Sequence, residues 1–193
     1  MFKKAVLILS LLFAGTFVHA QTADQVYDQY LDFNVARSQG QNAKALLIGE
    51  SILPNVAKLP AKSQLLYYNS IAKLYEDSSQ PEKAIKYYEM VIAAQPDYYV
   101  PHLALGYLYF DIANEIAKKL QTAKGDKQLT SEYNAAVQKA LPHLEKAQAC
   151  DPSDETLTLI KKLYANIKDT AGLNSLNSRL AAFSKNCITV LSE

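Results

Sequence analysis

Histidine and cysteine are the residue types in this chain that could hold a metal ion or act as a nucleophile, and they are few. The 193 residues include His19, His102 and His143, together with Cys150 and Cys187. None of them stands in an H-E-x-x-H, H-x-H or Cys/His cluster, and two Cys cannot supply a four-ligand zinc site. We therefore predict that the chain has no metal site.

The motifs of other reactive sites are missing as well. The sequence has no G-x-S-x-G, no P-loop and no G-x-G-x-x-G, and its acidic residues are scattered singly. We expect no catalytic residues and no cofactor, and hence no enzyme. Its 20 Lys and Arg against 19 Asp and Glu give a formal net charge of +1, which supplies no field for nucleic acid. Arg37 and Arg179 are the only arginines, so no arginine cluster is available to bind phosphate.

The first twenty residues are typical of a secretory signal peptide. Two lysines precede an uncharged run at 5–17, and Val18-His19-Ala20 forms a small-x-small cleavage site before Gln21. The alternative is an N-terminal membrane anchor, but this run is shorter than the ~18 residues that a spanning helix needs. We predict a signal peptide at 1–20 and an exported domain at 21–193 that does not insert into the membrane. A periplasmic location is favoured, and extracellular secretion is the alternative.

The segments that follow residue 21 have the pattern of helices. Apolar and small residues recur at spacings of three and four, and strand-like alternation is absent beyond a few residues. Thr22 and Gln25 resemble a capping box at the start of the first helix. Short polar breaks separate the helices, at 38–41, 77–81, 95–97, 124–126 and 151–153. The pattern predicts an all-α fold of antiparallel helical hairpins.

An internal repeat occupies the middle of the chain. The first copy reads Tyr68-x2-Ile71-Ala72-x2-Tyr75, then Ala84-x3-Tyr88 and Pro96; the second reads His102-x2-Leu105-Gly106-x2-Tyr109, then Ala140-x3-Leu144 and Pro152. Both copies resemble the tetratricopeptide repeat (TPR). The resemblance implies a short α-solenoid, with repeats at about 65–98 and 99–154 and a degenerate hairpin on each side. It also implies that the ring of His102 packs inside its hairpin.

The second copy is 22 residues longer than the first between its tyrosine and its small residue, Tyr109 and Ala140. Shared between two helices, the insertion adds about three turns to each, which predicts an elongated hairpin. Lys124-Gly125-Asp126 would form its tip, and Thr130 is a candidate N-cap for the returning helix. The alternative is a disordered loop.

The resemblance also implies a binding surface, because the first helices of successive TPR hairpins line a concave groove that holds peptide segments. The residues expected in this groove are Leu66, Asn69, Lys73, Glu76, Leu103, Tyr107 and Phe110. We therefore predict a non-enzymatic scaffold or adaptor of the cell envelope that binds a protein or peptide. Two possibilities stay open: the neighbouring hairpin or the C-terminal segment covers the groove, and the chain forms homo-oligomers.

The same resemblance makes a disulfide between the two cysteines possible. Cys150 ends the second helix of one predicted hairpin, and Cys187 follows the second helix of the next. Such helices run side by side in a TPR stack, so a disulfide between the two residues is compatible with an oxidising compartment. The alternative is two separate, inert thiols, and the sequence leaves both open.

Thirteen tyrosines and no Trp raise an alternative function, the binding of a glycan or another small ligand on exposed rings. Most tyrosines fall at repeat positions that imply packing between helices: Tyr67, Tyr68, Tyr75, Tyr87, Tyr88, Tyr107, Tyr109 and Tyr164. Tyr98 and Tyr99, at the turn between the repeats, are the expected candidates for exposed contact.

Overall fold

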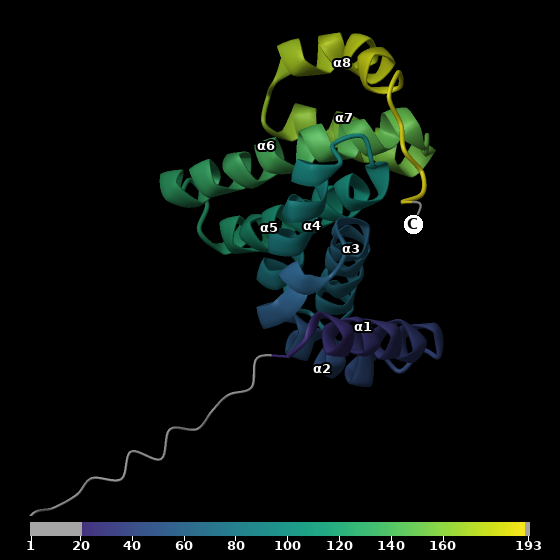
Figure 1. Cartoon of the computed structure of the whole chain (residues 1–193). Helices are drawn as coiled ribbons and strands as arrows, with labels where there is room; N and C mark the ends of the chain where they lie inside the picture. The colour runs from purple at the N-terminus through teal and green to yellow at the C-terminus, as the bar shows by residue number, and fades with distance from the viewer. Residues whose placement is uncertain (1–20, 192–193) are drawn as a thin grey trace, which may run out of the picture.

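A computed structural model describes residues 21–191, so the predicted signal peptide at 1–20 lies outside the described residues. The described part of the chain forms helices joined by short turns (Figure 1). They are α1 (Ala23–Ser38), α2 (Asn42–Ile52), η1 (Leu53–Lys58), α3 (Ala61–Asp77), α4 (Pro81–Ala94), α5 (Tyr99–Thr122), α6 (Lys127–Cys150), α7 (Asp154–Asn166) and α8 (Thr170–Phe183).

The helices pair into four consecutive antiparallel hairpins, α1/α2, α3/α4, α5/α6 and α7/α8. Each hairpin packs on the next, through α2 against α3, α4 against α5, and α6 against both α7 and α8. The prediction of an all-α stack of helical hairpins is confirmed. At the start of α1, the predicted capping box of Thr22 and Gln25 is present. Between residues 21 and 191, none of the helices is long and apolar enough to cross a membrane.

Three of the four hairpins turn in the same way. Gly40, Ser79 and Lys168 each lie two residues past the end of a first helix and adopt a positive φ, of 69°, 55° and 59°. In each turn the next residue donates its N–H to a carbonyl five residues earlier, at 2.9 to 3.0 Å: Gln41 to Ala36, Gln80 to Tyr75, and Asp169 to Tyr164. A residue of the first hairpin is therefore structurally equivalent to the residue 39 positions later in the second hairpin. The corresponding offset from the first hairpin to the last is 128 positions.

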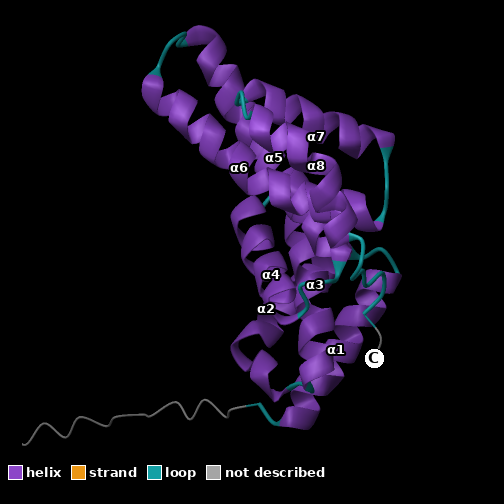
Figure 2. Ribbon diagram, turned by 90° about the horizontal axis from the view of Figure 1, so that it is seen from above, coloured by secondary structure: helices purple, strands orange, loops and turns teal. Residues whose placement is uncertain are grey.

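The α5/α6 hairpin is the elongated one. Both of its helices have 24 residues, against 17 in α3 and 14 in α4. When Tyr109 is aligned with Tyr75 and Ala140 with Ala84, residues 112–136 stand in place of the short turn at 78–80, and we call them the arm (Figures 1 and 2). Gly125 turns the chain at the tip with a φ of 81°.

The returning helix of the arm begins earlier than predicted. Asp126 is its N-cap and accepts a hydrogen bond from the N–H of Leu129 at 3.0 Å. The expectation that Thr130 caps this helix is wrong: Thr130 lies inside α6, and its hydroxyl donates to the carbonyl of Asp126 at 2.7 Å. A carboxylate placed three residues before the N–H that donates to it caps a helix at least as well as a threonine hydroxyl.

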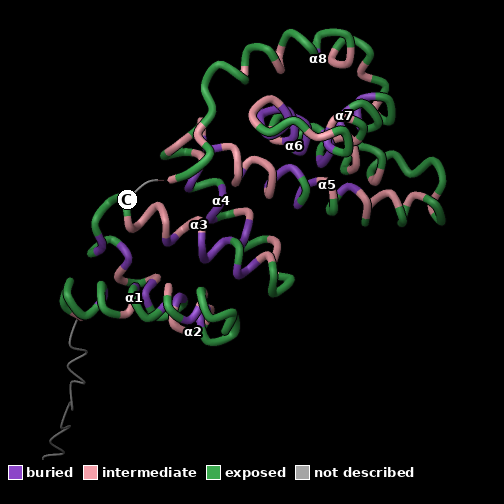
Figure 3. The backbone as a smooth tube through the Cα atoms, turned by 90° about the vertical axis from the view of Figure 1, so that its right-hand side faces the viewer, coloured by how far each residue is buried: buried purple, intermediate pink, exposed green. Residues whose placement is uncertain are grey.

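The core runs between the paired helices along the length of the stack (Figure 3). Small residues permit the helix crossings, since Ala84 and Ala140 are fully buried and a Cβ on Gly106 would lie 2.6 Å from Leu144. The tyrosines at repeat positions are buried or half-buried, except for the exposed Tyr107. The expectation of an exposed Tyr98 is wrong, because its ring is buried where the backbone pairs with the C-terminal segment.

Candidate functional site

The residues predicted to form the groove lie on α3 and α5, and they do not share one cavity. Glu76 lines an open cleft beside α5, Lys73 lines a smaller cavity against α1, and Leu66 lines a pocket against the C-terminal segment. On α5, Leu103 and Phe110 are half-buried, and Phe110 packs on the core. Tyr107 is exposed, and its hydroxyl lies 3.4 Å from that of Thr156 on α7.

The polar groove residues of α3 already bind one another. Lys73 forms ion pairs with Glu76 and Asp77, each at 2.8 Å, and Glu76 also accepts a hydrogen bond from Tyr88 at 2.8 Å. Asn69 differs from them, because its side-chain oxygen is buried without a hydrogen-bond partner among the described residues. The charged groove residues are thus engaged within the fold.

The largest of these cavities is a cleft of about 950 Å³ between the α3–α4 turn and the outer face of α5, which we call the arm cleft. The arm continues past the end of the α3/α4 hairpin, so this hairpin does not extend over the outer part of α5. Leu108, Ile112 and Ile116 follow one another along its floor at a spacing of four residues. An apolar row of this kind is normally buried against another helix.

Acidic side chains border the apolar row of the arm cleft. Glu76, Asp111 and Glu115 line it together with Lys118 and Lys119. Burial raises the pKa of the Asp111 carboxyl above its usual value, and the neighbouring Glu115 and Glu76 raise it further. The cleft thus combines a partly exposed apolar floor with Asp111, the lining carboxylate that forms no ion pair within residues 21–191.

The C-terminal tail, residues 184–191, covers the Leu66 end of the predicted groove. The N–H of Ile188 donates to the carbonyl of Asp97 at 2.7 Å, and the N–H of Tyr99 donates to the carbonyl of Ile188 at 3.2 Å. Tail residues then line a pocket of about 230 Å³ with Leu65 and Leu66 of α3. The possibility that the C-terminal segment covers the groove therefore holds at this end of it.

Two further contacts fasten the tail to α6. Lys146 forms an ion pair with Asp97 at 2.9 Å and donates a hydrogen bond to the carbonyl of Asn186. Cys150 and Cys187 are joined in a disulfide, with 5.5 Å between their Cα atoms. Of the two arrangements that the sequence leaves open for the cysteines, the structure has the bonded one.

A tyrosine–glutamate hydrogen bond is repeated wherever one hairpin packs on the next. A tyrosine of the first helix donates to a glutamate in the second helix of the preceding hairpin: Tyr75 to Glu50 at 3.1 Å, Tyr109 to Glu89 at 2.8 Å, and Tyr164 to Glu145 at 2.5 Å. We call these the junction pairs. Burial and the carboxylate acceptor raise the pKa of all three tyrosines, that of Tyr109 to about 12.

Sequence reasoning missed the junction pairs, although a signal for them exists. Each glutamate follows a small residue of the repeat by five positions: Glu50 follows Ala45, Glu89 follows Ala84, and Glu145 follows Ala140. The tyrosines already occupy repeat positions. A glutamate at a constant spacing in the preceding repeat is the signal that could have identified their hydrogen-bond partners.

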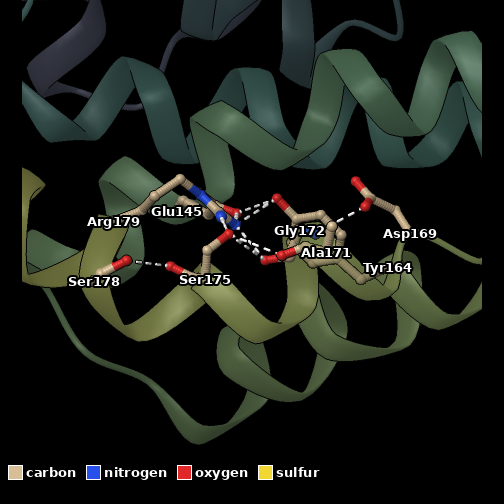
Figure 4. Close-up of polar contacts among 8 residues, drawn as sticks. All are labelled: Glu145, Tyr164, Asp169, Ala171, Gly172, Ser175, Ser178 and Arg179. Atoms are coloured by element: carbon tan, nitrogen blue, oxygen red, sulfur yellow. Dashed lines mark hydrogen bonds and ion pairs between the residues drawn. The ribbon is translucent and has the colours of Figure 1, made fainter.

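At the last junction, a buried ion pair is added to the hydrogen bond (Figure 4). The guanidinium of Arg179 on α8 donates from two nitrogens to the two oxygens of Glu145, each at 2.7 Å. It also donates to the Tyr164 hydroxyl at 2.7 Å and to the carbonyl of Gly172 at 3.0 Å. Arg179 thus joins α6, α7 and α8 and closes the C-terminal end of the stack.

The two described histidines face each other between α5 and α6. Nδ1 of His102 lies 3.0 Å from Nδ1 of His143, and Nε2 of His102 lies 3.1 Å from the carbonyl of Pro96. Because a carbonyl only accepts, His102 carries its proton on Nε2, and its Nδ1 accepts from His143. Burial lowers the pKa of both rings, that of His143 to about 4. Within residues 21–191, no three His, Cys, Asp or Glu side chains form a cluster that could hold a metal ion.

Three comparisons, with models of known protein families, with curated proteins and with solved structures, found no match to this chain. The case for a function therefore rests on the surfaces of the chain itself. Among the cavities described above, the arm cleft is the largest, and its apolar floor includes the exposed Ile112.

Proposed function

We propose that this chain is a non-enzymatic scaffold of the cell envelope that binds a protein or peptide in the arm cleft. The observation that carries the proposal is the row of Leu108, Ile112 and Ile116 on the floor of the cleft, in which Ile112 is exposed, Ile116 is half-buried and Leu108 is buried. A partner helix or extended segment that buried this row would remove apolar area from water, which is the main driving force of association. The TPR-like arrangement of the repeats supports the same function.

The charges around the cleft indicate the chemistry of the partner. Glu76 and Glu115 already form ion pairs with lysines of this chain. Asp111 is therefore the lining carboxylate that favours a segment with a lysine or arginine beside its apolar side chains. The alternative of a glycan platform has weaker support, because Tyr27 and Tyr107 are the only exposed tyrosines and lie on different hairpins. Stacked recognition of a sugar needs aromatic faces that are open to solvent.

Export to the envelope is part of the proposal. The disulfide between Cys150 and Cys187 is compatible with an oxidising compartment, where such bonds persist. Amino-terminal sequencing of the protein purified from the envelope is expected to begin at Gln21. A purified chain that still begins at Met1 would contradict cleavage of the signal peptide.

Matched substitutions test the arm cleft as the binding site. Ile112 on α5 and Met90 on α4 are 37% and 38% exposed, but Ile112 lines the cleft and Met90 faces away from the core of its hairpin. Affinity capture from envelope extract would compare the wild type with Ile112→Asp and Met90→Asp. We expect a co-purifying protein to be lost with Ile112→Asp and retained with Met90→Asp. Equal capture by the two variants would overturn the assignment of the site.

A further inference from the structure

The outer face of α1 is a second apolar surface, at the opposite end of the stack from the ion pair of Arg179 and Glu145. Tyr27, Leu31 and Val35 follow one another at a spacing of four residues and are 40%, 46% and 51% exposed. They lie on the side of α1 away from Val26 and Phe33, which are fully buried in the core. Three large apolar side chains in one exposed row are unusual for a surface that meets only solvent.

The structurally equivalent residues of α3 indicate what kind of contact this face of α1 can make. Through the 39-residue equivalence, Leu31 and Val35 correspond to Ser70 and Leu74 of α3, which are buried beside the preceding hairpin. The next row, Asp28 and Asp32, corresponds to Tyr67 and Ile71. Tyr67 donates a hydrogen bond to the carbonyl of Gly49 at 2.7 Å, and Ile71 packs against the same glycine. The outer face of α1 is therefore the position on which a preceding hairpin would stack.

A hairpin of this chain's own kind does not fit there. Ala36 occupies the position of Tyr75, so α1 cannot supply the tyrosine of a junction pair. At the other end of the stack, α8 has Ser178 at the position of Glu50 and cannot supply the glutamate. End-to-end stacking of two copies would thus lack the contact that marks every internal junction.

Charge also argues against pairing of α1 with α1 of a second copy. Asp24, Asp28 and Asp32 form an exposed acidic row at the same spacing of four, directly beside the apolar row. None of the three forms an ion pair within residues 21–191. Two copies meeting through this face would bring six carboxylates together, which is unfavourable at neutral pH.

We propose that the outer face of α1 binds an amphipathic helix of a partner protein. The apolar side chains of that helix would cover Tyr27, Leu31 and Val35, and its lysines or arginines would pair with Asp24, Asp28 and Asp32. This surface is separate from the arm cleft, which lies on α5. The chain would therefore hold two partner segments at once, one at the N-terminal end of the stack and one on the arm.

A pair of designed helical peptides tests the proposal on the full chain as the cell produces it. Both peptides have about 18 residues and one leucine stripe, flanked by lysines in one peptide and by glutamates in the other. Fluorescence anisotropy is expected to show saturable binding of the lysine peptide that weakens as salt is added. We expect Leu31→Asp to weaken this binding about tenfold, and the double change Asp28→Lys with Asp32→Lys to weaken it similarly. Circular dichroism would verify that each variant keeps its helix content.

Matched controls separate this surface from the arm cleft. Ile112→Asp removes an apolar residue of the cleft and is expected to leave binding of the lysine peptide unchanged. Binding that responds to Ile112→Asp but not to Leu31→Asp would overturn the proposal and assign the peptide to the cleft. Equal binding of the glutamate peptide would overturn it as well, as would a dimer of the chain that Leu31→Asp dissociates.

Discussion

The first and the last junction pairs have the same chemistry in different surroundings. At the first, the Glu50 side chain is 42% exposed, and among the described residues its ionic contact is with Lys83 alone, at 3.3 Å. At the last, the Glu145 side chain is 3% exposed and binds Arg179 through both oxygens. The repeated hydrogen bond orients each hairpin on the preceding one. We expect the burial of the glutamate to determine how much each junction contributes to stability. This contrast predicts that the last junction is held more strongly than the first.

Removal of the Glu145 carboxylate is expected to have the largest effect. Glu145→Ala leaves the guanidinium of Arg179 and the hydroxyl of Tyr164 without their acceptor inside the last junction. The free energy of unfolding should fall by ~3–5 kcal/mol, as when one partner of a buried ion pair is removed. Urea denaturation followed by circular dichroism measures this change.

The same substitution at the first junction is the control. Glu50→Ala removes an exposed acceptor and should cost less than ~1 kcal/mol. If the two variants lost equal stability, the difference in burial between the junctions would not determine their strength.

Loss of the disulfide should have the next largest effect. Replacing Cys150 and Cys187 with serine removes a crosslink between residues 37 apart, which is expected to lower the free energy of unfolding by ~2–4 kcal/mol. Hydrogen exchange should quicken most at the amides of Tyr99 and Ile188, whose hydrogen bonds hold the tail. Unchanged exchange at these two amides would show that Lys146 alone keeps the tail in place.

The histidine pair predicts a loss of stability in acid. Burial lowers the pKa of His143 from its usual 6.5 to about 4 in the folded chain. Between about pH 4 and pH 6.5, the imidazole is therefore protonated in the unfolded chain and neutral in the folded chain. Stability from this group is complete above about pH 6.5 and is lost as the pH falls towards 4. After allowance for partial solvent exposure, His143→Phe should remove up to ~2 kcal/mol of this acid loss. Thermal melts of both proteins at about pH 7.5 and pH 4.5 compare the losses, and parallel losses would refute the assignment.

The smallest expected effect is at the first tyrosine. Tyr75→Phe removes only the hydroxyl that donates to Glu50, whose carboxylate keeps Lys83 and access to water. The free energy of unfolding should fall by ~0.5–1 kcal/mol, the net value of one hydrogen bond. Tyr164→Phe is the comparison at the buried end, and it should cost more than Tyr75→Phe.

The hairpins could be predicted from the sequence because their signals are local. Apolar spacing predicted the four hairpins, and polar breaks predicted the turns at 38–41, 77–81, 95–97, 124–126 and 151–153, since both depend on residues a few positions apart. The 3-10 helix η1 and the α7–α8 turn were not predicted. The start of α6 was misplaced because Asp126 and Thr130 are both good caps, and the choice depends on how the tip turns. Local patterns of this kind predict the individual hairpins but not the contacts between hairpins that complete the stack.

The contacts that distinguish the two ends join residues far apart in sequence. Arg179 meets Glu145 across 34 residues, and the tail reaches Asp97 from Ile188. Periodicity within one helix carries no information on such pairs, so Arg179 was noted only as one of two arginines, and Tyr98 was expected at the surface. The groove residues were placed on the correct helices, but their distribution over three cavities depends on the arm and on the tail.

Photo-crosslinking in living cells is the most direct measurement of the central claim, that the arm cleft receives a protein partner. A photoreactive amino acid would replace Ile112 in one strain and Met90 in another, two positions of nearly equal exposure. The account predicts a discrete crosslinked product from position 112 that is absent from position 90. Crosslinking at position 90 alone, or the same products from both positions, would contradict it.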